Sequence, residues 1–557
     1  MMTVPTDARL YAYIEQGSQP YVLPPIGQPP KMRGEKILWV LQADSAQMHT
    51  TQGGYTVREQ KITFDAPVLT RNFVGVPHCD FFGQKFHFGF PDGDELAETL
   101  AHFYWHCLLP QVAERTVMRR RIKLREGYVL STLDTQFYGG TYPCVDHEFH
   151  IRGRLAMRSA LDLAVVRRMI ALQLRVMETD PKGLYRSVCS VQPRGKREYL
   201  VTRRSRDHRE KAVMFRLTGN IELIEEVYGY YCATKDADFL ARCLPTLEKS
   251  AAYIASFLQP NDLIDSQVYY EDQVMKDGAV AQAQAFAAQA LDRLAELCAC
   301  AGQEGEDYRA LAARLREAYV RDVPRGFWHP KTQRYVDWID RQGRVHDHVH
   351  LLANALPVLF GFNPPERDAQ INDTIAQHDN IFQKFPSFVA AKIEDYSESE
   401  LGTGGPYDLC AAGRYWCHDA KYRAHIGQHE RIKAQLLQVA RQAQADHYQM
   451  GERYDMNYVY YQDDKNWHGA ARYYEYPCVF ADVLIHDYLG VRAAVDADIA
   501  LAPQLPQGTV TLEAWGIRYT VADGALTVHN IASHPLTVRV GDVIQKIQPN
   551  GMWTFGR

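Results

Sequence analysis

The sequence predicts a multidomain protein in which a large domain of paired helices, an (α/α)6 toroid, lies between two β-rich regions. Its 557 residues are too many for one ordinary domain. The hydrophobic period is close to two near both ends and about 3.6 across the middle. Aromatic, glycine-rich loops separate the helical segments. We predict an N-terminal β-rich domain (1–125), a helical domain (126–495) and a C-terminal β-sandwich (496–557).

The N-terminal region predicts short strands. Residues 36–41 form an apolar run, and Phe86, Phe88 and Phe90 alternate with polar or small residues. A basic stretch at 119–125 lies near the predicted boundary, and we interpret it as a solvated linker or helix face.

The middle of the chain repeats the spacing of one buried helical face. The first run consists of Leu163, Val166, Ile170, Leu174 and Met177. Residues 283–297 and 308–319 repeat the pattern. Long helices joined by alternating short and aromatic loops favour helical hairpins arranged in a ring. The absence of a tight sequence repeat argues against a regular solenoid.

The last part of the chain returns to strands. Gly490 is placed as the C-cap of a final helix. Apolar residues alternate in 517–521 and again in 526–528, on either side of an Asp523-Gly524 hairpin turn. We therefore expect a small β-sandwich that covers one flank of the helical domain.

Composition excludes several classes of protein. A net charge of -5 is too acidic for a nucleic-acid binder of this length. We see neither a secretory signal nor an apolar run that could span a membrane, so we expect a cytoplasmic protein without a membrane partner. The 11 cysteines are scattered, which favours reduced, mostly buried thiols. The many tyrosines and tryptophans beside carboxylates suit a sugar site or an aromatic-rich core.

Several short sequence motifs in the helical domain support a resemblance to a known enzyme family. The segments are 218–220 (Thr-Gly-Asn), 228–231 (Tyr-Gly-Tyr-Tyr), 327–330 (Phe-Trp-His-Pro), 335–337 (Tyr-Val-Asp) and 354–357 (Asn-Ala-Leu-Pro). With the order of domains, these segments resemble the six-hairpin glycosidases, especially their α-L-rhamnosidase-like branch. The resemblance implies a cofactor-free hydrolase that removes a terminal sugar from an oligosaccharide, with inversion, by paired carboxyl groups. The rhamnosidase acidic cluster with its Gly-Trp pair is not intact here, so the sugar is left open.

Three carboxylates are candidates for the acid side of the reaction. Asp146 and Glu148 follow an aromatic loop, where the resemblance places sugar-binding carboxylates and the acid. They are two residues apart, so we expect only one to point into the cavity. The alternative is a helix start, with Asp146 as N-cap and Glu148 near the positive dipole end. Asp272 is a second acid candidate, although the nearby Lys276 favours a substrate clamp because it would lower the pKa.

Glu452 and Glu475 compete for the role of base. The resemblance places the base in a late loop before a histidine-bearing segment, which Glu452 fits. Arg453 could instead hold Glu452 in a structural bridge. Glu475 lies between tyrosines and before a proline, and the sequence leaves the choice open.

Aromatic and polar residues near these carboxylates are candidates for binding the sugar. They are Tyr138, Tyr142, Glu271, Trp416, His418, Trp467, His468 and Tyr474. Residues 347–350 superficially resemble a metal site, but we expect His348 and His350 to diverge and predict no metal. Loop 402–406 lacks the ending of a phosphate-binding loop and fits a substrate-loop turn.

Two other classes of function stay open. An (α/α)6 sugar epimerase or polysaccharide lyase would use histidine or tyrosine as its base. A non-catalytic carbohydrate-binding protein would bind sugar without turnover. The sequence leaves open the sugar, the linkage, the anomeric configuration and the oligomeric state, a homo-oligomer included.

Overall fold

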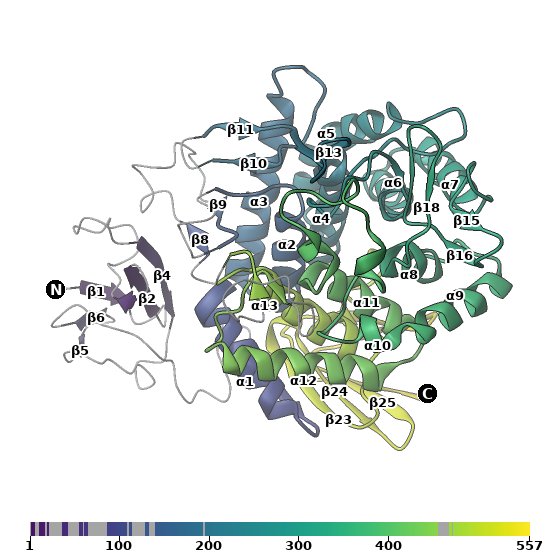
Figure 1. The fold of residues 1–557 in the computed structure, drawn as a ribbon. Coiled ribbons are helices and arrows are strands. Elements are labelled where there is room, and N and C mark those ends of the chain that lie inside the picture. Colours follow the sequence, from purple (N-terminus) through teal and green to yellow (C-terminus); the bar gives the residue numbers. More distant parts are fainter. Residues whose placement is uncertain are drawn as a thin grey trace.

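Figure 1 shows the chain in a computed structural model. The structure describes strands between residues 2 and 64, and then residues 86–108, 111–113, 128–132, 140–192, 195–454, 467–470 and 472–556. The basic stretch at 119–125 and Tyr138 lie outside the described residues. None of the described helices has the length and apolar character needed to cross a membrane. Ten cysteines lie in the described part; no disulfide bond forms among them, and most of them are buried.

Six helices contact one another in cyclic order, the last one contacting the first. They are α2 (Asp146–Met157), α4 (Thr218–Thr234), α6 (Ala281–Cys300), α8 (Leu351–Leu359), α11 (Gly413–His425) and α13 (Glu475–Asp482). We call them the inner helices. They are mostly buried, which explains why their hydrophobic pattern is less one-sided than that of a surface helix.

Amphipathic helices pack on the outside of this ring and contact the inner helices. They are α3 (Ala160–Glu178), α5 (Ala237–Ala255), α7 (Glu306–Tyr319), α9 (Pro365–Gln377) and α12 (His429–Ala445). The predicted buried face of α3 is confirmed, because Val166, Ile170, Leu174 and Met177 are buried. The Ser159 hydroxyl caps α3 by accepting a hydrogen bond from the Asp162 amide at 3.0 Å.

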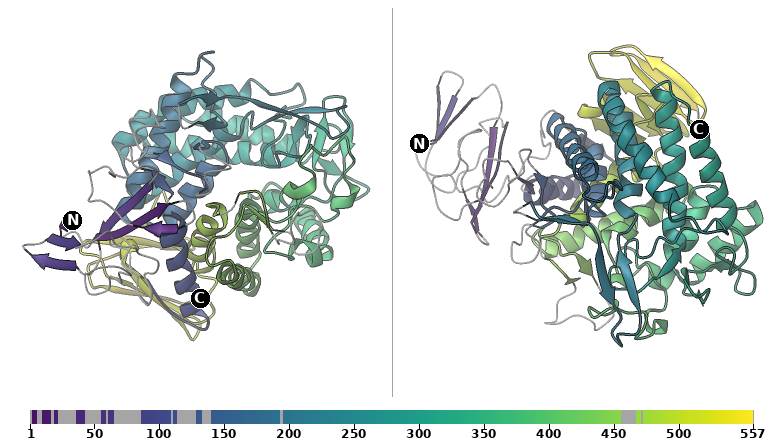
Figure 2. Two further views of the ribbon diagram at one scale, coloured as in Figure 1. Left: turned by 60° about the vertical axis from the view of Figure 1, so that its left-hand side comes forward. Right: turned by 90° about the horizontal axis from the view of Figure 1, so that it is seen from above.

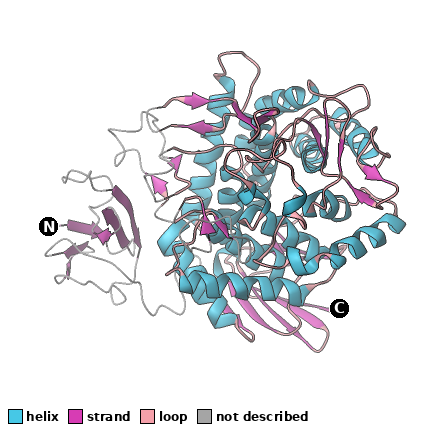
Figure 3. Ribbon diagram, viewed as in Figure 1, coloured by secondary structure: helices cyan, strands magenta, loops and turns pink. Residues whose placement is uncertain are grey.

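Short sheets occupy the loops that precede inner helices (Figure 3). They pair β10 (Ser190–Val191) with β11 (Arg197–Glu198), β12 (Val201–Arg204) with β13 (Lys211–Met214), β15 (Trp328–His329) with β16 (Arg334–Tyr335), and β19 (Arg453–Tyr454) with β20 (Trp467–His468). A further sheet has the order β14 (Gly278–Val280), β17 (Trp338–Asp340), β18 (Val345–His346). The helical turns between these elements are α10 (Asp379–Phe382), Ile393–Asp395 and Pro406–Leu409.

The C-terminal region forms two sheets, seen in yellow in Figure 2. One has the order β21 (Val491–Arg492), β22 (Ile499–Leu501), β26 (Leu536–Val540), β27 (Val543–Ile547). The other has the order β28 (Met552–Gly556), β25 (Ala525–Asn530), β24 (Ile517–Ala522), β23 (Gly508–Leu512), β7 (Phe86–Gly89). The predicted hairpin is confirmed, with Asp523 and Gly524 at φ 50° and 73°.

Hydrogen bonds from aromatic side chains are among the contacts that join this region to the helices. The Trp515 indole N–H donates to the Ala156 carbonyl at 2.9 Å, and the Tyr519 hydroxyl donates to the Leu489 carbonyl at 2.8 Å. The final helix continues from α13 into a π-helical segment (Val483–Tyr488), and Gly490 follows with φ 68°. The predicted glycine at this helix end is therefore confirmed.

Elements from the first part of the chain pack on the later ones. Strand β7 pairs antiparallel with β23, and α1 (Gly93–Phe103) contacts α12 and α13. The π-helical segment Tyr104–Leu108 extends α1, and β8 (Val112–Ala113) pairs with β9 (Tyr128–Val129). Residues 86–103 thus lie against elements that the sequence assigns to the other two domains, whose exact limits stay predictions.

The N-terminal strands form two further antiparallel sheets. Their orders are β1 (Met2–Pro5), β6 (Lys61–Phe64), β5 (Tyr55–Arg58) and β3 (Gln19–Tyr21), β2 (Leu10–Gln16), β4 (Lys36–Gln42). Strand β4 contains the apolar run at 36–41, which confirms that predicted strand.

Candidate active site

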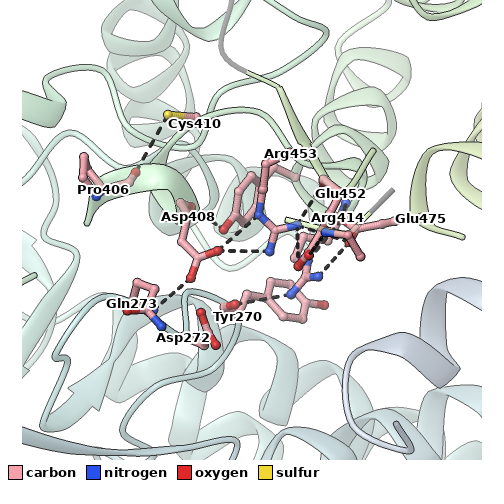
Figure 4. Close-up of polar contacts among 12 residues, drawn as sticks. Tyr270, Asp272, Gln273, Pro406, Asp408, Cys410, Arg414, Glu452, Arg453 and Glu475 are labelled. Carbon is pink, nitrogen blue, oxygen red and sulfur yellow. Dashed lines mark hydrogen bonds and ion pairs between the residues drawn. The ribbon is translucent and has the colours of Figure 1, made fainter. Parts of the chain in front are cut away.

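Carboxylates and two arginines from distant parts of the chain meet where α2, α11 and α13 begin (Figure 4). We call this group the acid–arginine cluster. It consists of Asp146, Asp272, Asp408, Glu452, Glu475, Arg414 and Arg453. Of the carboxylates predicted as catalytic, the structure brings Asp146, Asp272, Glu452 and Glu475 together here, and places Glu148 elsewhere.

Arg414 and Glu475 form the buried centre of the cluster. The Arg414 guanidinium donates to the two carboxylate oxygens of Glu475 at 3.1 and 2.7 Å, and the Arg414 backbone amide donates at 2.5 Å. Arg453 lies 3.6 Å away. Burial opposes ionisation of Glu475, but Arg414 and Arg453 outweigh it and lower its pKa. Because its side chain is fully buried, Glu475 serves to hold Arg414.

Asp408 and Asp272 form a carboxyl pair beside Arg453. Arg453 donates to one oxygen of Asp408 at 3.2 and 3.0 Å, and the Gln273 amide donates to the other at 2.8 Å. Burial and the neighbouring Asp272 raise the pKa of Asp408 well above its usual range. Burial also acts on Asp272, but a hydrogen bond from Asp408 and the charge of Arg203 lower its pKa. Burial and Asp272 thus oppose the charge on Asp408, whereas the surroundings of Asp272 favour its charged form.

The pKa of Asp272 is lowered, as expected, but its lowering comes from Asp408 and nearby arginines, while Lys276 pairs with other carboxylates. The Lys276 ammonium lies 2.7 Å from Asp337 and 3.2 Å from Glu271, both of them fully buried. Glu271, a predicted sugar ligand, also accepts a hydrogen bond from Gln282 at 2.7 Å and contacts His350 at 2.9 Å. Burial opposes its ionisation, but Lys276 and His350 lower its pKa. Glu271 is part of a closed ionic network that supports the loop carrying Asp272.

Glu452 lies at the edge of the cluster and is 7% exposed. The Ala470 amide donates to its Oε2 at 3.1 Å, and Arg453 lies 3.5 Å from Oε1. Burial raises the pKa of Glu452, although the two arginines oppose it. Gly469 has φ 88°, and a Cβ atom at that position would overlap the Glu452 side chain.

Replacing Gly469 by alanine is expected to displace the Glu452 carboxylate. With Glu452 in the role proposed for it below, turnover should fall about 100-fold, since small displacements of catalytic groups cost that much. Gly343→Ala is a matched control, because Gly343 has a similar φ of 80° but open space around it. Initial rates of both variants at saturating substrate measure the difference. Equal losses in the two variants would mean that backbone strain alone is responsible.

Asp146 lies at the start of α2 and is 6% exposed. Its carboxylate accepts hydrogen bonds from Ser131, from Tyr473 at 3.2 Å and from Tyr474 at 3.0 Å. Burial raises the pKa of Asp146 to about 7, against the opposing charge of Arg414. The alternative that Asp146 caps α2 is wrong, because Val145 occupies the N-cap position and Asp146 bonds to other elements.

Glu148 faces away from this cluster. Its Oε1 accepts from Arg152 at 2.9 and 2.5 Å, and its Oε2 accepts from the Tyr270 hydroxyl at 3.0 Å. The expectation that only one of Asp146 and Glu148 points into the site is consistent with this divergence. Glu148 is therefore outside the acid–arginine cluster, and its acid role stays a prediction.

Glu148 lines a cavity of about 1080 Å³ between the inner helices and the C-terminal sheets. Residues near the ends of inner helices also line it, among them Ala233, Leu359 and His425. Tyr270 separates this cavity from the cluster, because its carbonyl accepts from Arg414 at 3.4 Å while its hydroxyl bonds to Glu148. The cluster and the cavity therefore lie toward opposite ends of the inner helices.

The remaining predicted sugar ligands divide into three groups. Tyr474 lies in the cluster through Asp146, and Tyr142 is half-buried. His418 is buried and lines the cavity, and Trp416 is fully buried against Tyr476 and Phe480, so neither faces the cluster. Trp467 and His468 form β20, which pairs with β19 next to Glu452; their side chains are outside the described residues.

The sequence alone does not single out three residues of this region, Arg414, Asp408 and Ser131. Arg414 offered one signal, because a cation in the first turn of a helix opposes the helix dipole and calls for a carboxylate partner. Asp408 follows the glycine-rich loop 402–406, whose Gly404 amide donates to the Gln273 side chain at 2.8 Å. The sequence favours a substrate-loop turn there and gives no separate signal for the neighbouring Asp408.

No protein-family model and no curated protein sequence matches this chain. Among solved structures, the GH78 family rhamnosidase of Bacillus sp. GL1 aligns with 86% of this chain and 45% of its own, at TM-score 0.53 and 14% identity. The fold is similar to that of rhamnosidases. A rhamnosidase from Klebsiella oxytoca with rhamnose bound aligns with 82% of this chain and 73% of its own, at TM-score 0.50 and 11% identity.

Both solved structures are rhamnosidases, so the resemblance expected from the sequence holds at the level of the fold. The chain spans less than half the length of the Bacillus rhamnosidase. At this level of identity the likeness concerns the fold, and the chemistry has to be argued from the cluster itself.

Proposed function

We propose that the protein is a glycoside hydrolase built on an (α/α)6 toroid, which removes a terminal sugar from an oligosaccharide by acid–base catalysis with inversion. The acid–arginine cluster carries this proposal. It holds a carboxyl group that keeps a proton near neutral pH and another carboxyl beside it, the pair that glycoside hydrolysis needs. The cyclic contacts of the inner helices and the rhamnosidase-like fold support it.

Asp146 is the proposed general acid. Its pKa of about 7 lets it hold a proton for the leaving oxygen, and it is slightly exposed. Glu452 is the proposed base, because its side chain is slightly exposed whereas Glu475 is fully buried in its pair with Arg414. Asp272 is ionised and a quarter exposed, which suits a clamp for sugar hydroxyls.

Turnover is expected to fall roughly tenfold per pH unit above about pH 7, because Asp146 then loses the proton it must donate. The pH–rate profile of the wild type measures this limb, and Asp146→Asn should lack it.

The stability of the folded protein also depends on the protonation of Asp146. The ordinary pKa is 3.8, so between about pH 4 and pH 7 the folded protein retains a proton that the unfolded chain releases. Asp146 thus destabilises the fold as pH rises through that window. A pH–rate profile left unchanged by Asp146→Asn would contradict the assignment of Asp146 as the general acid.

The proposal is tested with a panel of aryl glycosides and plant or bacterial oligosaccharides. Wild type, Glu452→Gln and Glu475→Gln are compared, with NMR of the first anomer released. We expect Glu452→Gln to lower turnover about 10²–10⁴-fold and inversion to be seen. Glu304→Gln, an exposed change on a surface turn, is the control. Sugar binding without release by the wild type would point to a binding protein. Tolerance of Glu452→Gln with loss on His468→Gln would point to an epimerase or lyase.

A further inference from the structure

Two histidines and a glutamate meet outside the acid–arginine cluster. His346 ends β18, His348 follows two residues later, and Glu400 comes from the loop after the Ile393–Asp395 turn. The Oε1 atom of Glu400 lies 2.6 Å from Nδ1 of His346 and 3.0 Å from Nε2 of His348. All three donor atoms lie within 4.8 Å of one another, and the described residues hold no other such group.

Aromatic contacts fix both imidazole rings. His346 stacks on Trp338 at 3.9 Å between ring centroids, with an interplanar angle of 10°. His348 stacks on Tyr396 at 3.7 Å and 11°. The side chains of the three residues are 12–17% exposed, so solvent reaches the group. The nitrogens are therefore oriented before any ligand arrives.

A second layer of polar groups supports the same atoms. The far nitrogen of His346, Nε2, lies 3.5 Å from Oδ2 of Asp340, near enough for electrostatic attraction but without a hydrogen bond, because that oxygen accepts from Arg344. The far oxygen of Glu400, Oε2, accepts from the Ser397 amide at 2.7 Å and from its hydroxyl at 2.8 Å. A carboxylate behind a histidine and a hydrogen-bonded ligand carboxylate are the outer contacts that orient metal ligands in proteins.

We propose that Nδ1 of His346, Nε2 of His348 and Oε1 of Glu400 bind a zinc ion. Two imidazole nitrogens and one carboxylate oxygen suit zinc, with the fourth position left to water or a ligand oxygen. Tetrahedral bonds of about 2.0–2.2 Å separate ligand atoms by about 3.3 Å. Glu400 therefore has to move away from His346 by about 0.7 Å and from His348 by about 0.3 Å. The inference is independent of the proposed hydrolase activity.

Because of where the three ligands lie, a bound ion would stabilise the fold. The Glu400 carbonyl accepts from the Met275 amide at 2.7 Å, and the Gly402 amide donates to the Gln273 carbonyl at 2.7 Å. The loop that carries Glu400 therefore lies along the segment that carries Asp272. A bound ion would tie this loop to the β17–β18 hairpin and raise the melting temperature of the protein.

Isothermal titration of the full chain with zinc, after removal of metal with a chelator, tests the proposal. One tight equivalent is expected in the wild type and in His534→Gln, an exposed control histidine. His348→Gln and Glu400→Gln should lose it, and Asp340→Asn should weaken it about 10–100-fold. Cobalt provides a second readout, since a tetrahedral site gives intense visible absorption. Equal zinc binding by wild type and His348→Gln, with both folded by circular dichroism, would overturn the proposal.

Discussion

Asp146→Asn is expected to lower the hydrolysis of a natural oligosaccharide about 10²–10⁴-fold, the usual contribution of a positioned general acid. An aryl glycoside with a strongly acidic phenol should lose far less, because its leaving oxygen needs no proton. The asparagine keeps the shape of the side chain and can still contact Ser131, Tyr473 and Tyr474. Steady-state rates on the two substrates measure the difference.

The control for this experiment is Asp238→Asn, an exposed carboxylate in the first turn of α5. It should leave both rates unchanged. If Asp146→Asn reduced hydrolysis of both substrates equally, Asp146 would act in binding or folding, and the assignment of the proton donor would be wrong.

Arg414→Met is expected to lower the free energy of unfolding by about 3–5 kcal/mol, the cost of breaking a buried ion pair from one side. Methionine fills much of the same volume but leaves the Glu475 carboxylate buried. Its remaining compensation is Arg453 at 3.6 Å and the backbone amide of residue 414 at 2.5 Å. Urea denaturation followed by circular dichroism measures the change, with midpoint and slope compared between variants.

A double variant separates the lost pair from lost packing. Arg414→Met combined with Glu475→Gln should recover part of the loss, because no charge is then left alone in the interior. Arg206→Met removes an exposed arginine from its pair with Glu398 and should cost less than about 1 kcal/mol. Additive losses for Arg414 and Glu475 would show that the two side chains are not coupled.

The sequence predicted the helices and strands that are determined by residues close together in the chain. The buried face of α3 follows from the spacing of its apolar residues, and the β24–β25 hairpin follows from Asp523 and Gly524. Neither needs knowledge of the rest of the chain. The pairing of β7 with β23 could not be predicted in this way, because nothing in 86–89 specifies a partner beyond residue 500.

The candidate site divides along the same line. Asp146, Glu452 and Glu475 stood out because each lies in an aromatic loop. Arg414 and Asp408 did not, because their roles depend on ion-pair partners that are 61 and 45 residues away in the sequence. The depth of Glu475 and the direction of Glu148 depend on packing between helices, which spacing alone does not reveal.

The strand β7 has a consequence for the synthesis of the protein. It leaves the ribosome more than 400 residues before its partner β23. At about 5–20 residues per second, that interval is roughly 20–80 s. During this time the buried faces of Phe86 and Phe88 have no partner strand and must be shielded in some other way. The newborn chain therefore passes through a stage that is open to chaperones and to aggregation, and a slowly translated stretch before β23 would prolong it.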